Sequence, residues 1–389
     1  MLYNREENYW KEKDAIYTAS EIAQEPRMWL KIRDIVKQNK ERINAILDEL
    51  FKDDEYDIVL TGAGTSEFVG NSIYNYLNTL LDFHVRSIGT TDIVASPASY
   101  LNPKRRTLMI SFARSGNSPE SVAAVHCANT VCSDIRHIFV TCNKDGALNK
   151  IQNELDNAFS LNMPDETNDL SFAMTSSYSC MYLATVLMFM QYKGLAFDSI
   201  VEELAENGQK FLDEKAAYVE EIVESFPYNR VVYLGSNDLK GVSQESALKT
   251  CELTAGNIMT TFDTTMGFRH GPKSVVKDDS LIVVYVSDDE YTRQYDRDIV
   301  REISGDGVGK LLVLSSYEDE ELASLADYFV SIGNKTRYPN VFLGLEYVLT
   351  GQLLGLFKSL NGGNTPDNPC SSGQVFRVVR GVTIYPYER

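Results

Sequence analysis

The stretch TLMISFARSGNSPES, residues 107 to 121, decides the fold. It opens with an apolar run that predicts a buried strand, continues through small and hydroxyl-bearing residues around Gly116, and resumes as a helix at Pro119. Such a turn presents free backbone N–H groups at a helix N-terminus, where the helix dipole also favours negative charge. The stretch therefore predicts either an anion site, for which phosphate is the commonest ligand, or a simple helix cap at Ser118.

The same alternation of apolar strands and helical stretches extends along most of the chain. Strands are predicted at 57–62, 84–88, 107–112, 137–142 and 158–161, and again at 230–236, 257–262, 280–287, 310–315 and 328–332. Strands that alternate with helices at this spacing form a doubly wound parallel sheet, as in three-layer flavodoxin-like sandwiches. The sequence thus predicts an α/β fold with two copies of one architecture.

Both ends of the chain depart from this alternation. Residues 1–50 keep a helical period, and Thr18 followed by Glu21 predicts a capping box at a helix start. Residues 341–360 predict a long apolar helix, followed by an irregular tail rich in Gly and Pro. We therefore expect a helical extension over 1–50, a first domain over 51–206, and a second domain over 219–389 that includes the tail.

Composition excludes several classes of protein. The chain has 389 residues and a formal net charge of −18, which argues against a basic nucleic-acid surface. Its most apolar run, MYLATVLMFM from Met181, is half of the ~20 residues that a membrane span requires, so we expect a core helix and no membrane partner. The N-terminus lacks the apolar core of a secretion signal, and the six cysteines show no paired spacing. We expect a cytoplasmic protein with reduced thiols.

Motifs for metals and nucleotides are absent from the sequence. There is no HExxH, HxH or paired CxxC, and no Walker-type phosphate loop. The segment TGAGTSEFVG, residues 61 to 70, has Glu67 where a dinucleotide fingerprint requires its third glycine. We therefore expect no cofactor and no metal.

The segment ARSGNSPE, residues 113 to 120, resembles the phosphate loop S-x-S-G-x-[ST]-x-[DE] of the sugar isomerase (SIS) domain family, with Ala113 in place of the first serine. The helical lead-in SEIAQEPRMW, residues 20 to 29, also resembles that family. The resemblance implies two tandem SIS domains and a sugar-phosphate ligand. Carried over to this chain, it implies phosphate binding by Arg114, Ser115, Gly116, Asn117 and Ser118.

Other segments imply further substrate contacts. The turn TGAGTS, residues 61 to 66, is similar to the family's G-x-G-[TS]-S turn, which implies sugar contacts from Gly64, Thr65 and Ser66; a helix cap at Thr65 or Ser66 is the alternative. The segment ETNDLSFAMTSS, residues 166 to 177, matches a substrate-lining segment and makes Ser176 a candidate. A lysine that enters the site near the C-terminus of some relatives corresponds to Arg380.

The segment QESALKTCELT, residues 244 to 254, places Glu245, Lys249 and Glu252 on one face of a predicted helix. A solvated ladder of salt bridges would have the same spacing. The pattern E-x-A-L-K-x-x-E also resembles the family's catalytic helix. That resemblance implies that Glu252 moves a proton between C1 and C2 of the sugar, that Lys249 contacts the sugar, and that Glu245 orients Lys249.

The loop GFRHGPKS, residues 267 to 274, sets His270 apart from the three other histidines, His84, His126 and His137, which we expect to be structural. Imidazole exchanges protons near physiological pH. The loop resembles the family's histidine loop, which opens the sugar ring and commonly serves the neighbouring subunit. The resemblance therefore implies a homodimer or a dimer of dimers.

The phrases ARSGNSPES, GFRHGPKS and TPDNPC together resemble the tagatose-6-phosphate ketose/aldose isomerases, also described as galactosamine-6-phosphate deaminase/isomerases. This implies that a phosphorylated amino sugar, galactosamine 6-phosphate, becomes tagatose 6-phosphate and ammonia through an enolamine. The alternatives are an isomerase without deamination, a deaminase of glucosamine or fructosamine phosphates, and a sugar-phosphate sensor without catalysis. Contacts to one or two hydroxyl groups would decide between sugar epimers.

Overall fold

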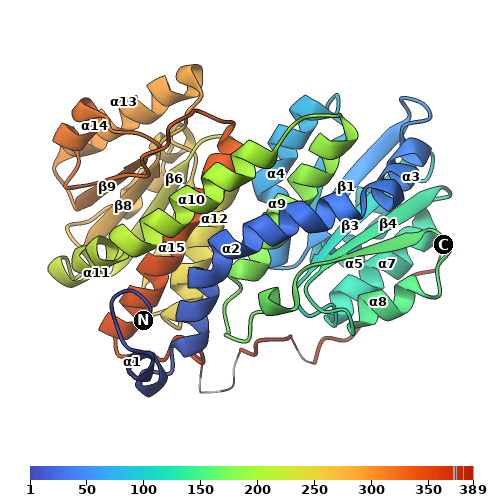
Figure 1. Ribbon diagram of the computed structural model, residues 1–389, viewed down its shortest axis with the longest axis horizontal. Coiled ribbons are helices and arrows are strands. Elements are labelled where there is room, and N and C mark those ends of the chain that lie inside the picture. The colour runs from blue at the N-terminus through green and yellow to red at the C-terminus, as the bar shows by residue number, and fades with distance from the viewer. Residues whose placement is uncertain (371–372, 374, 380, 389) are drawn as a thin grey trace. The chain divides into compact units, whose positions relative to one another are not determined.

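The computed structural model describes residues 1–370, 373, 375–379 and 381–388. It contains two parallel five-stranded sheets (Figure 1), with strand orders β2-β1-β3-β4-β5 and β10-β9-β8-β6-β7. Written from the other edge, the second order repeats the first, since β6 follows β7 as β1 follows β2. The predicted α/β fold with two copies of a doubly wound parallel sheet is confirmed.

Every predicted strand is present, within a few residues of its predicted limits. The first sheet contains β1 (Tyr56–Gly62), β2 (Val85–Gly89), β3 (Arg106–Ala113), β4 (Ile135–Thr141) and β5 (Ala158–Asn162). The second contains β6 (Arg230–Gly235), β7 (Met259–Asp263), β8 (Ser280–Tyr285), β9 (Lys310–Ser315) and β10 (Tyr328–Ser331).

Helices connect and flank these strands. Those up to the end of the first sheet are α1 (Glu7–Glu12), α2 (Ile16–Gln38), α3 (Lys40–Leu50), α4 (Thr65–Leu80), α5 (Thr90–Ala95), α6 (Pro97–Tyr100), α7 (Pro119–Val131) and α8 (Ala147–Gln152). Those that follow are α9 (Ser176–Tyr192), α10 (Asp198–Glu214), α11 (Ala216–Ser225), α12 (Asp238–Leu253), α13 (Glu290–Asp306), α14 (Glu320–Leu325) and α15 (Asn340–Asn361). Short 3₁₀ turns lie at Asp165–Thr167, Gly267–Arg269 and Pro272–Val275.

Contacts divide the chain into two compact units, each discontinuous in sequence. Unit 1 comprises Met1–Arg27, Leu170–Thr175 and Glu202–Ser371 and contains the second sheet. Unit 2 comprises Met28–Asp169, Ser176–Val201 and Ser372–Arg389 and contains the first sheet. The domain limits predicted at residues 50, 206 and 219 stay a prediction.

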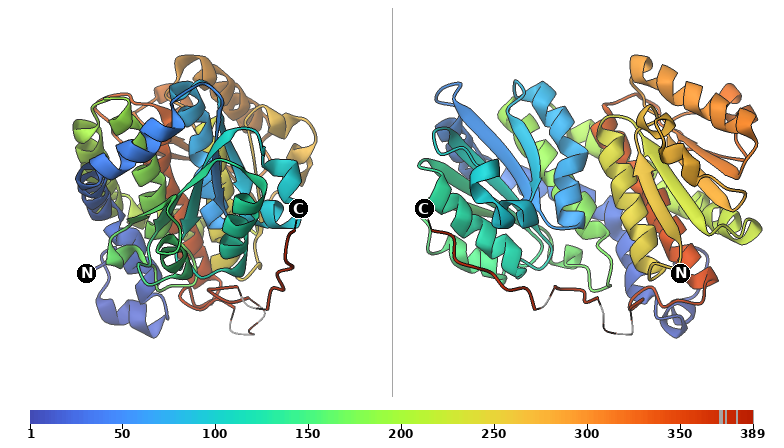
Figure 2. Two further views of the ribbon diagram at one scale, coloured as in Figure 1. Left: turned by 90° about the vertical axis from the view of Figure 1, so that its right-hand side faces the viewer. Right: turned by 180° about the vertical axis from the view of Figure 1, so that it is seen from behind.

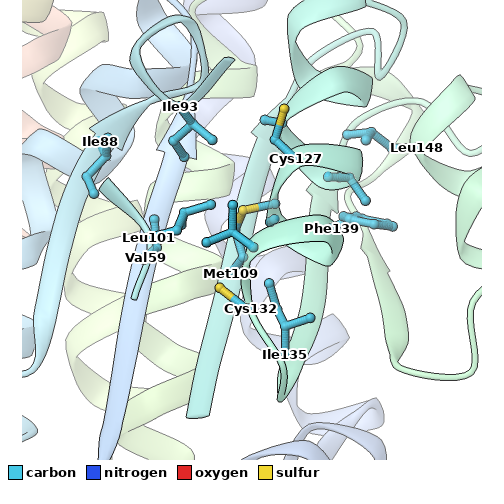
Figure 3. Close-up of a cluster of buried hydrophobic side chains, with 14 of the residues drawn as sticks. Val59, Ile88, Ile93, Leu101, Met109, Cys127, Cys132, Ile135, Phe139 and Leu148 are labelled. Carbon is cyan, nitrogen blue, oxygen red and sulfur yellow. The ribbon is translucent and has the colours of Figure 1, made fainter. Parts of the chain in front are cut away.

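The sheet of unit 2 is covered on both faces. Helices α3, α4 and α9 pack together on one face. On the other face, a core of apolar side chains from β1, β3 and β4 meets the helices α5, α7 and α8 (Figure 3), with Val59, Met109 and Phe139 all fully buried. Successive strand residues face opposite sides of a sheet, so burial on both faces explains why β1, β3 and β4 are almost continuously apolar. The predicted core helix at Met181 is α9, whose residues 176 to 190 are all buried.

The sheet of unit 1 is covered by α12 and α15 on one face and by α13 and α14 on the other. Helix α15 is the one helix of the described chain that is long and apolar enough to cross a membrane, but all of that apolar window is buried, as in a core helix. Two glycines let α12 approach α15 closely. A Cβ atom at Gly351 would lie 2.3 Å from the Ser246 hydroxyl, and one at Gly355 would lie 3.2 Å from the Lys249 carbonyl oxygen.

The predicted capping box at Thr18 and Glu21 is wrong. Helix α2 begins two residues earlier, at Ile16. The amide of Tyr17 donates to the carboxylate of Asp367 at 2.9 Å, and the amide of Thr18 donates to it at 2.7 Å. Glu21 instead accepts from the backbone amide of Ser171 at 3.2 Å. A carboxylate about 350 residues later in the chain therefore accepts hydrogen bonds from free amides in the first turn of α2, and no local sequence pattern predicts this contact.

We predict that Gly351→Ala lowers the free energy of unfolding by ~1–3 kcal/mol, because the added methyl group overpacks the α12–α15 contact. Gly305→Ala is the matched control, since a Cβ there would meet nothing within 4 Å. Better helix propensity should leave that variant neutral or more stable by up to ~1 kcal/mol. Urea titration of both variants measures the difference, and equal midpoints would contradict the tight contact.

Candidate active site

Three predicted residues share one face of α12. The Lys249 ammonium lies 3.2 Å from Glu245 Oε1 and 2.5 Å from Glu252 Oε2. The side chains of Glu245 and Lys249 are fully buried, whereas that of Glu252 is 26% exposed. The alternative of a solvated salt-bridge ladder therefore does not describe this helix. Lys249 is therefore held inside unit 1 beside Glu245, and the Glu252 carboxylate next to them is partly exposed to solvent.

The electrostatics of this group keep Lys249 charged. Burial alone would lower the pKa of its ammonium group, but the adjacent carboxylates of Glu245 and Glu252 outweigh burial and raise that pKa. A buried ion pair is costly to break, since removal of one partner leaves an uncompensated charge. Lys249 is thus a fixed positive charge that holds the Glu252 carboxylate in one orientation.

His270 lies in an exposed loop that is anchored on both sides. Its backbone amide closes a turn on the carbonyl of Gly267 at 2.9 Å. Arg269, one residue before it, pairs with Glu302 of α13 at 2.7 Å, and Lys273, three residues after it, pairs with Asp306 at 2.5 Å and also with Glu302. The imidazole is exposed. The loop therefore holds an exposed histidine and is anchored to α13 by these ion pairs, and no local sequence pattern indicates that α13 supplies the anchor.

The other three histidines have separate surroundings. His137 is buried in β4, and burial lowers its pKa to about 4. The Arg105 guanidinium donates a hydrogen bond to His84 Nδ1 at 3.1 Å, and His126 lies on α7. None of them belongs to the groups described for α12 or the His270 loop.

The predicted phosphate loop joins β3 to α7 in unit 2. Gly116 adopts a left-handed φ of +65°, which favours glycine, and the carbonyl of Gly116 accepts from the Leu148 amide at 3.1 Å. The Asn117 side chain accepts from the Ala147 amide at 2.9 Å. Ser118 is the N-cap residue of α7, but its hydroxyl bonds with Ser121 at 2.6 Å instead of capping the helix. The Ser118 side chain therefore does not cap α7, contrary to the simple helix-cap alternative.

Arg114, at the start of this loop, is buried and bonded to the C-terminal tail. Its guanidinium donates to the carbonyl of Arg377 at 2.8 Å. The Arg377 guanidinium in turn donates to the carbonyl oxygen of Asp169 at 3.0 Å. The tail thus connects the predicted phosphate loop to the segment before α9, and Arg377 is a member of this site that the sequence did not indicate.

The predicted sugar-contacting turn leads from β1 into α4. Gly64 is the N-cap residue with a φ of +57°, and Thr65 and Ser66 are buried in the first turn of α4. Ser176, the first residue of α9, donates its hydroxyl to the Asp169 carboxylate. Ser177 binds the other oxygen of that carboxylate through its amide at 2.9 Å, so Asp169 caps α9. Arg380 lies outside the described residues.

The corresponding loops of the second sheet have different chemistry. The turn from β6 into α12 repeats the shape of the Gly64 turn, because Asn237 has φ +56° and ψ −126° where Gly64 has φ +57° and ψ −130°. The loop after β8, however, carries Ser287, Asp288 and Asp289 where the loop after β3 carries serines and glycine. An acidic loop repels a phosphate, so the features predicted to bind an anion occur in the first copy of the architecture and not in this loop of the second. Across the described part of the chain, no group of three His, Cys, Asp or Glu side chains could hold a metal.

Comparison with known proteins agrees with this fold. Residues 50–191 match the SIS domain model. A curated relative from Shewanella sp. (strain ANA-3), named D-galactosamine-6-phosphate deaminase AgaS, is 41% identical over 96% of this chain and 92% of its own length. The chain belongs to the SIS domain family.

Two solved structures extend the comparison over the full chain. A crystal structure of tagatose-6-phosphate ketose/aldose isomerase from Escherichia coli has a TM-score of 0.89 at 37% identity and covers 96% of this chain and 97% of that one. A structure from Clostridium novyi NT, described as a candidate for the same activity, has a TM-score of 0.95 at 41% identity and covers 100% of this chain and 99% of that one. The prediction of two tandem SIS domains is confirmed.

We predict that Glu302→Ala loosens the His270 loop, because it removes the shared partner of Arg269 and Lys273. Partly exposed pairs of this kind contribute ~1 kcal/mol together, so amide hydrogen exchange over 267–276 should accelerate about fivefold. The control is Asp298→Ala, which removes a carboxylate of the same helix that pairs with Arg301 at 2.9 Å. Equal exchange in the two variants would show that α13 does not anchor the loop.

Proposed function

We propose that the protein converts galactosamine 6-phosphate and water into tagatose 6-phosphate and ammonia. The broader prediction, an enzyme among the amino-sugar-phosphate deaminases and isomerases, is confirmed by relatives of nearly equal length. The choice of the galacto sugar and of deamination rests on the name that the curated relatives share. This assignment leaves the sensor alternative without support from those relatives.

The observation that supports the mechanism is the difference in side-chain exposure between Lys249 and Glu252 on α12. Glu252 is 26% exposed and lies 2.5 Å from a lysine that is itself fully buried. A base that moves a proton between neighbouring carbons must reach the substrate and keep one orientation. In the proposed mechanism, Glu252 takes the proton from C2 and returns it at C1. Lys249 fixes the carboxylate and stabilises negative charge that develops on oxygen, while Glu245 holds Lys249.

Ring opening precedes the proton transfer, because the sugar phosphate is a cyclic hemiacetal. We assign this step to His270, because its imidazole is exposed and a neutral imidazole carries one nitrogen that donates and one that accepts a hydrogen bond. The exposure of this loop supports a role for His270 in the site of a neighbouring subunit. We therefore propose a homodimer or a dimer of dimers.

We assign phosphate binding to the β3–α7 loop, with Ser115, Gly116, Asn117 and Ser118 as ligands. The left-handed Gly116 and the start of a 13-residue helix at Pro119 support this assignment. Arg114 has a modified role: its guanidinium bonds to the tail, so it contributes positive charge from a fixed position. Gly64, Thr65, Ser66 and Ser176 stay predictions for sugar binding.

The atoms of the reaction balance with water as the only co-reactant. Removal of the C2 proton gives an enolamine, and protonation at C1 gives a ketimine at C2. Water adds to the ketimine carbon, the carbon–nitrogen bond breaks, and ammonia leaves as the ketone forms. No oxidant, reductant or cofactor enters this balance. All six cysteines are thiols, which supports a reducing, cytoplasmic setting.

The proposed activity is tested by release of ammonia from galactosamine 6-phosphate, beside glucosamine 6-phosphate and tagatose 6-phosphate, with ketose phosphate measured in the same samples. We expect ammonia and tagatose 6-phosphate in equal amounts from the galacto substrate, and at least ~10-fold lower kcat/KM for the gluco substrate, as one misplaced hydroxyl predicts. Interconversion of tagatose 6-phosphate with an aldose and no ammonia would replace the proposal by a plain isomerase.

The proton-transfer role is tested by Glu252→Gln, which keeps the shape of the side chain but removes the base. We expect kcat to fall by ~10²–10⁴-fold with little change in substrate binding, because general base catalysis contributes a factor of that size. Glu224→Gln, on the surface of α11, is the control and should keep full activity. Exchange of the C2 hydrogen with deuterium from solvent should disappear with Glu252→Gln, and its survival would refute the assigned base.

A further inference from the structure

A groove with a volume of about 590 Å³ lies on unit 2, and its lining includes Glu120, two residues after the proposed phosphate ligand Ser118. One wall is formed by α5, α6 and the residues that join them, and the other by residues 382 to 387 of the tail. Figure 2 shows the tail ending beside these helices, and Tyr387 packs against the same apolar core as Val94. Pockets of this size accept small organic molecules, which typically require about 300–1000 Å³.

The floor of the groove contains a buried carboxylate. Glu120, the second residue of α7, lines the groove and is 9% exposed. Its Oε2 atom has no hydrogen-bond donor among the described residues. The N-terminal dipole of α7 favours a negative charge at this position, but a dipole does not replace a hydrogen bond, and an unpaired buried carboxylate oxygen is unfavourable. A donor supplied by a ligand would complete the site.

The remaining lining residues restrict the chemistry of that ligand. The groove is lined by one carboxylate and by no lysine, arginine or histidine within the described chain. An anion such as a sugar phosphate would therefore be repelled. The walls are apolar and aromatic, with Val94, Pro97, Ile384 and the rings of Tyr385 and Tyr387. Tyrosine rings attract organic cations through their faces.

We propose that this groove binds a small organic cation, a primary ammonium group on a compact apolar or aromatic body, with the ammonium group at Glu120. The ammonium donates to the unpaired carboxylate oxygen, and the body contacts Val94 and the tail tyrosines. None of the residues assigned to catalysis or to the sugar phosphate lines the groove. The site is therefore additional to the proposed reaction and does not depend on it.

The probe is benzylammonium chloride, titrated into the full-length protein by isothermal calorimetry. Benzyl alcohol has the same body without the charge, and benzoate reverses the charge. We expect benzylammonium to bind at least tenfold more tightly than benzyl alcohol, and benzoate not to bind. Equal affinity for the cation and the alcohol, or no binding of benzylammonium at millimolar concentrations, would overturn the proposal.

Two variants locate the binding. Glu120→Gln should weaken benzylammonium binding at least tenfold and leave binding of benzyl alcohol unchanged. Ala98→Trp should block both ligands by filling the groove from α6 without altering the carboxylate, whereas Ser99→Trp, at a neighbouring position that does not line the groove, should bind normally. If Glu120 only stabilised α7, then Glu120→Gln would lower the melting temperature and leave the affinity for benzylammonium unchanged, which would overturn the proposal.

Competition separates the groove from the proposed substrate site. Tagatose 6-phosphate lacks an amine, so it should not displace benzylammonium if the two sites are separate. Displacement by tagatose 6-phosphate would assign the cation to the substrate site and overturn the inference. Failure of the ammonia assay would leave this result unaffected, because the titration requires no turnover.

Discussion

The interaction on which unit 1 depends is the buried ion pair between Glu245 and Lys249. Burying two charged groups away from water is unfavourable unless each has a partner of opposite charge. Here Lys249 has two carboxylate partners, Glu245 and Glu252. Both carboxylates come from its own helix, one turn to either side. The ion pair therefore depends on the helical conformation of α12 alone. Its burial depends on the packing of α12 against α15 and the sheet. That packing in turn requires glycine on α15, because Gly351 and Gly355 let the helix carrying the charges come close.

The two copies of the sheet differ in the residues that follow their equivalent strands. In the first copy, the turn after β3 contains hydroxyl groups, amides and a left-handed glycine. In the second, the corresponding turn contains acids, and the residues that we propose for catalysis lie on the face of α12 and in the loop of His270. Asn237 keeps a backbone conformation that favours glycine, at φ +56°. This retained shape without a retained glycine supports a common origin of the two turns and indicates some local strain.

Sequence predicted the fold well because its signals are local. Strands buried on both faces are continuous apolar runs, and each was found within a few residues of its limits. The shared face of Glu245, Lys249 and Glu252 also followed from helical spacing, although spacing alone could not tell a buried pair from a solvated ladder. Burial depends on α15, which lies about a hundred residues further along the chain.

Long-range contacts could not be predicted in this way. Thr18 and Glu21 fit the local pattern of a capping box, yet Asp367 supplies the cap of α2. The position of Arg114 in the loop motif predicts a phosphate ligand, but no local signal connects its guanidinium to the carbonyl of Arg377. No sequence pattern indicates Glu302, since its role depends on how α13 packs beside the histidine loop. In each case the missing information is the identity of a partner distant in sequence.

The cap that Asp367 gives to α2 has a consequence for synthesis. Unit 1 contains both Asp367 and the first turn of α2, so that turn is completed by a residue that is made 350 residues after Tyr17. A ribosome adds ~5–20 residues per second and releases the N-terminus first. The amides of Tyr17 and Thr18 therefore lack this carboxylate partner until residue 367 has been made. The first turn of α2 can be completed only after residue 367 has been made.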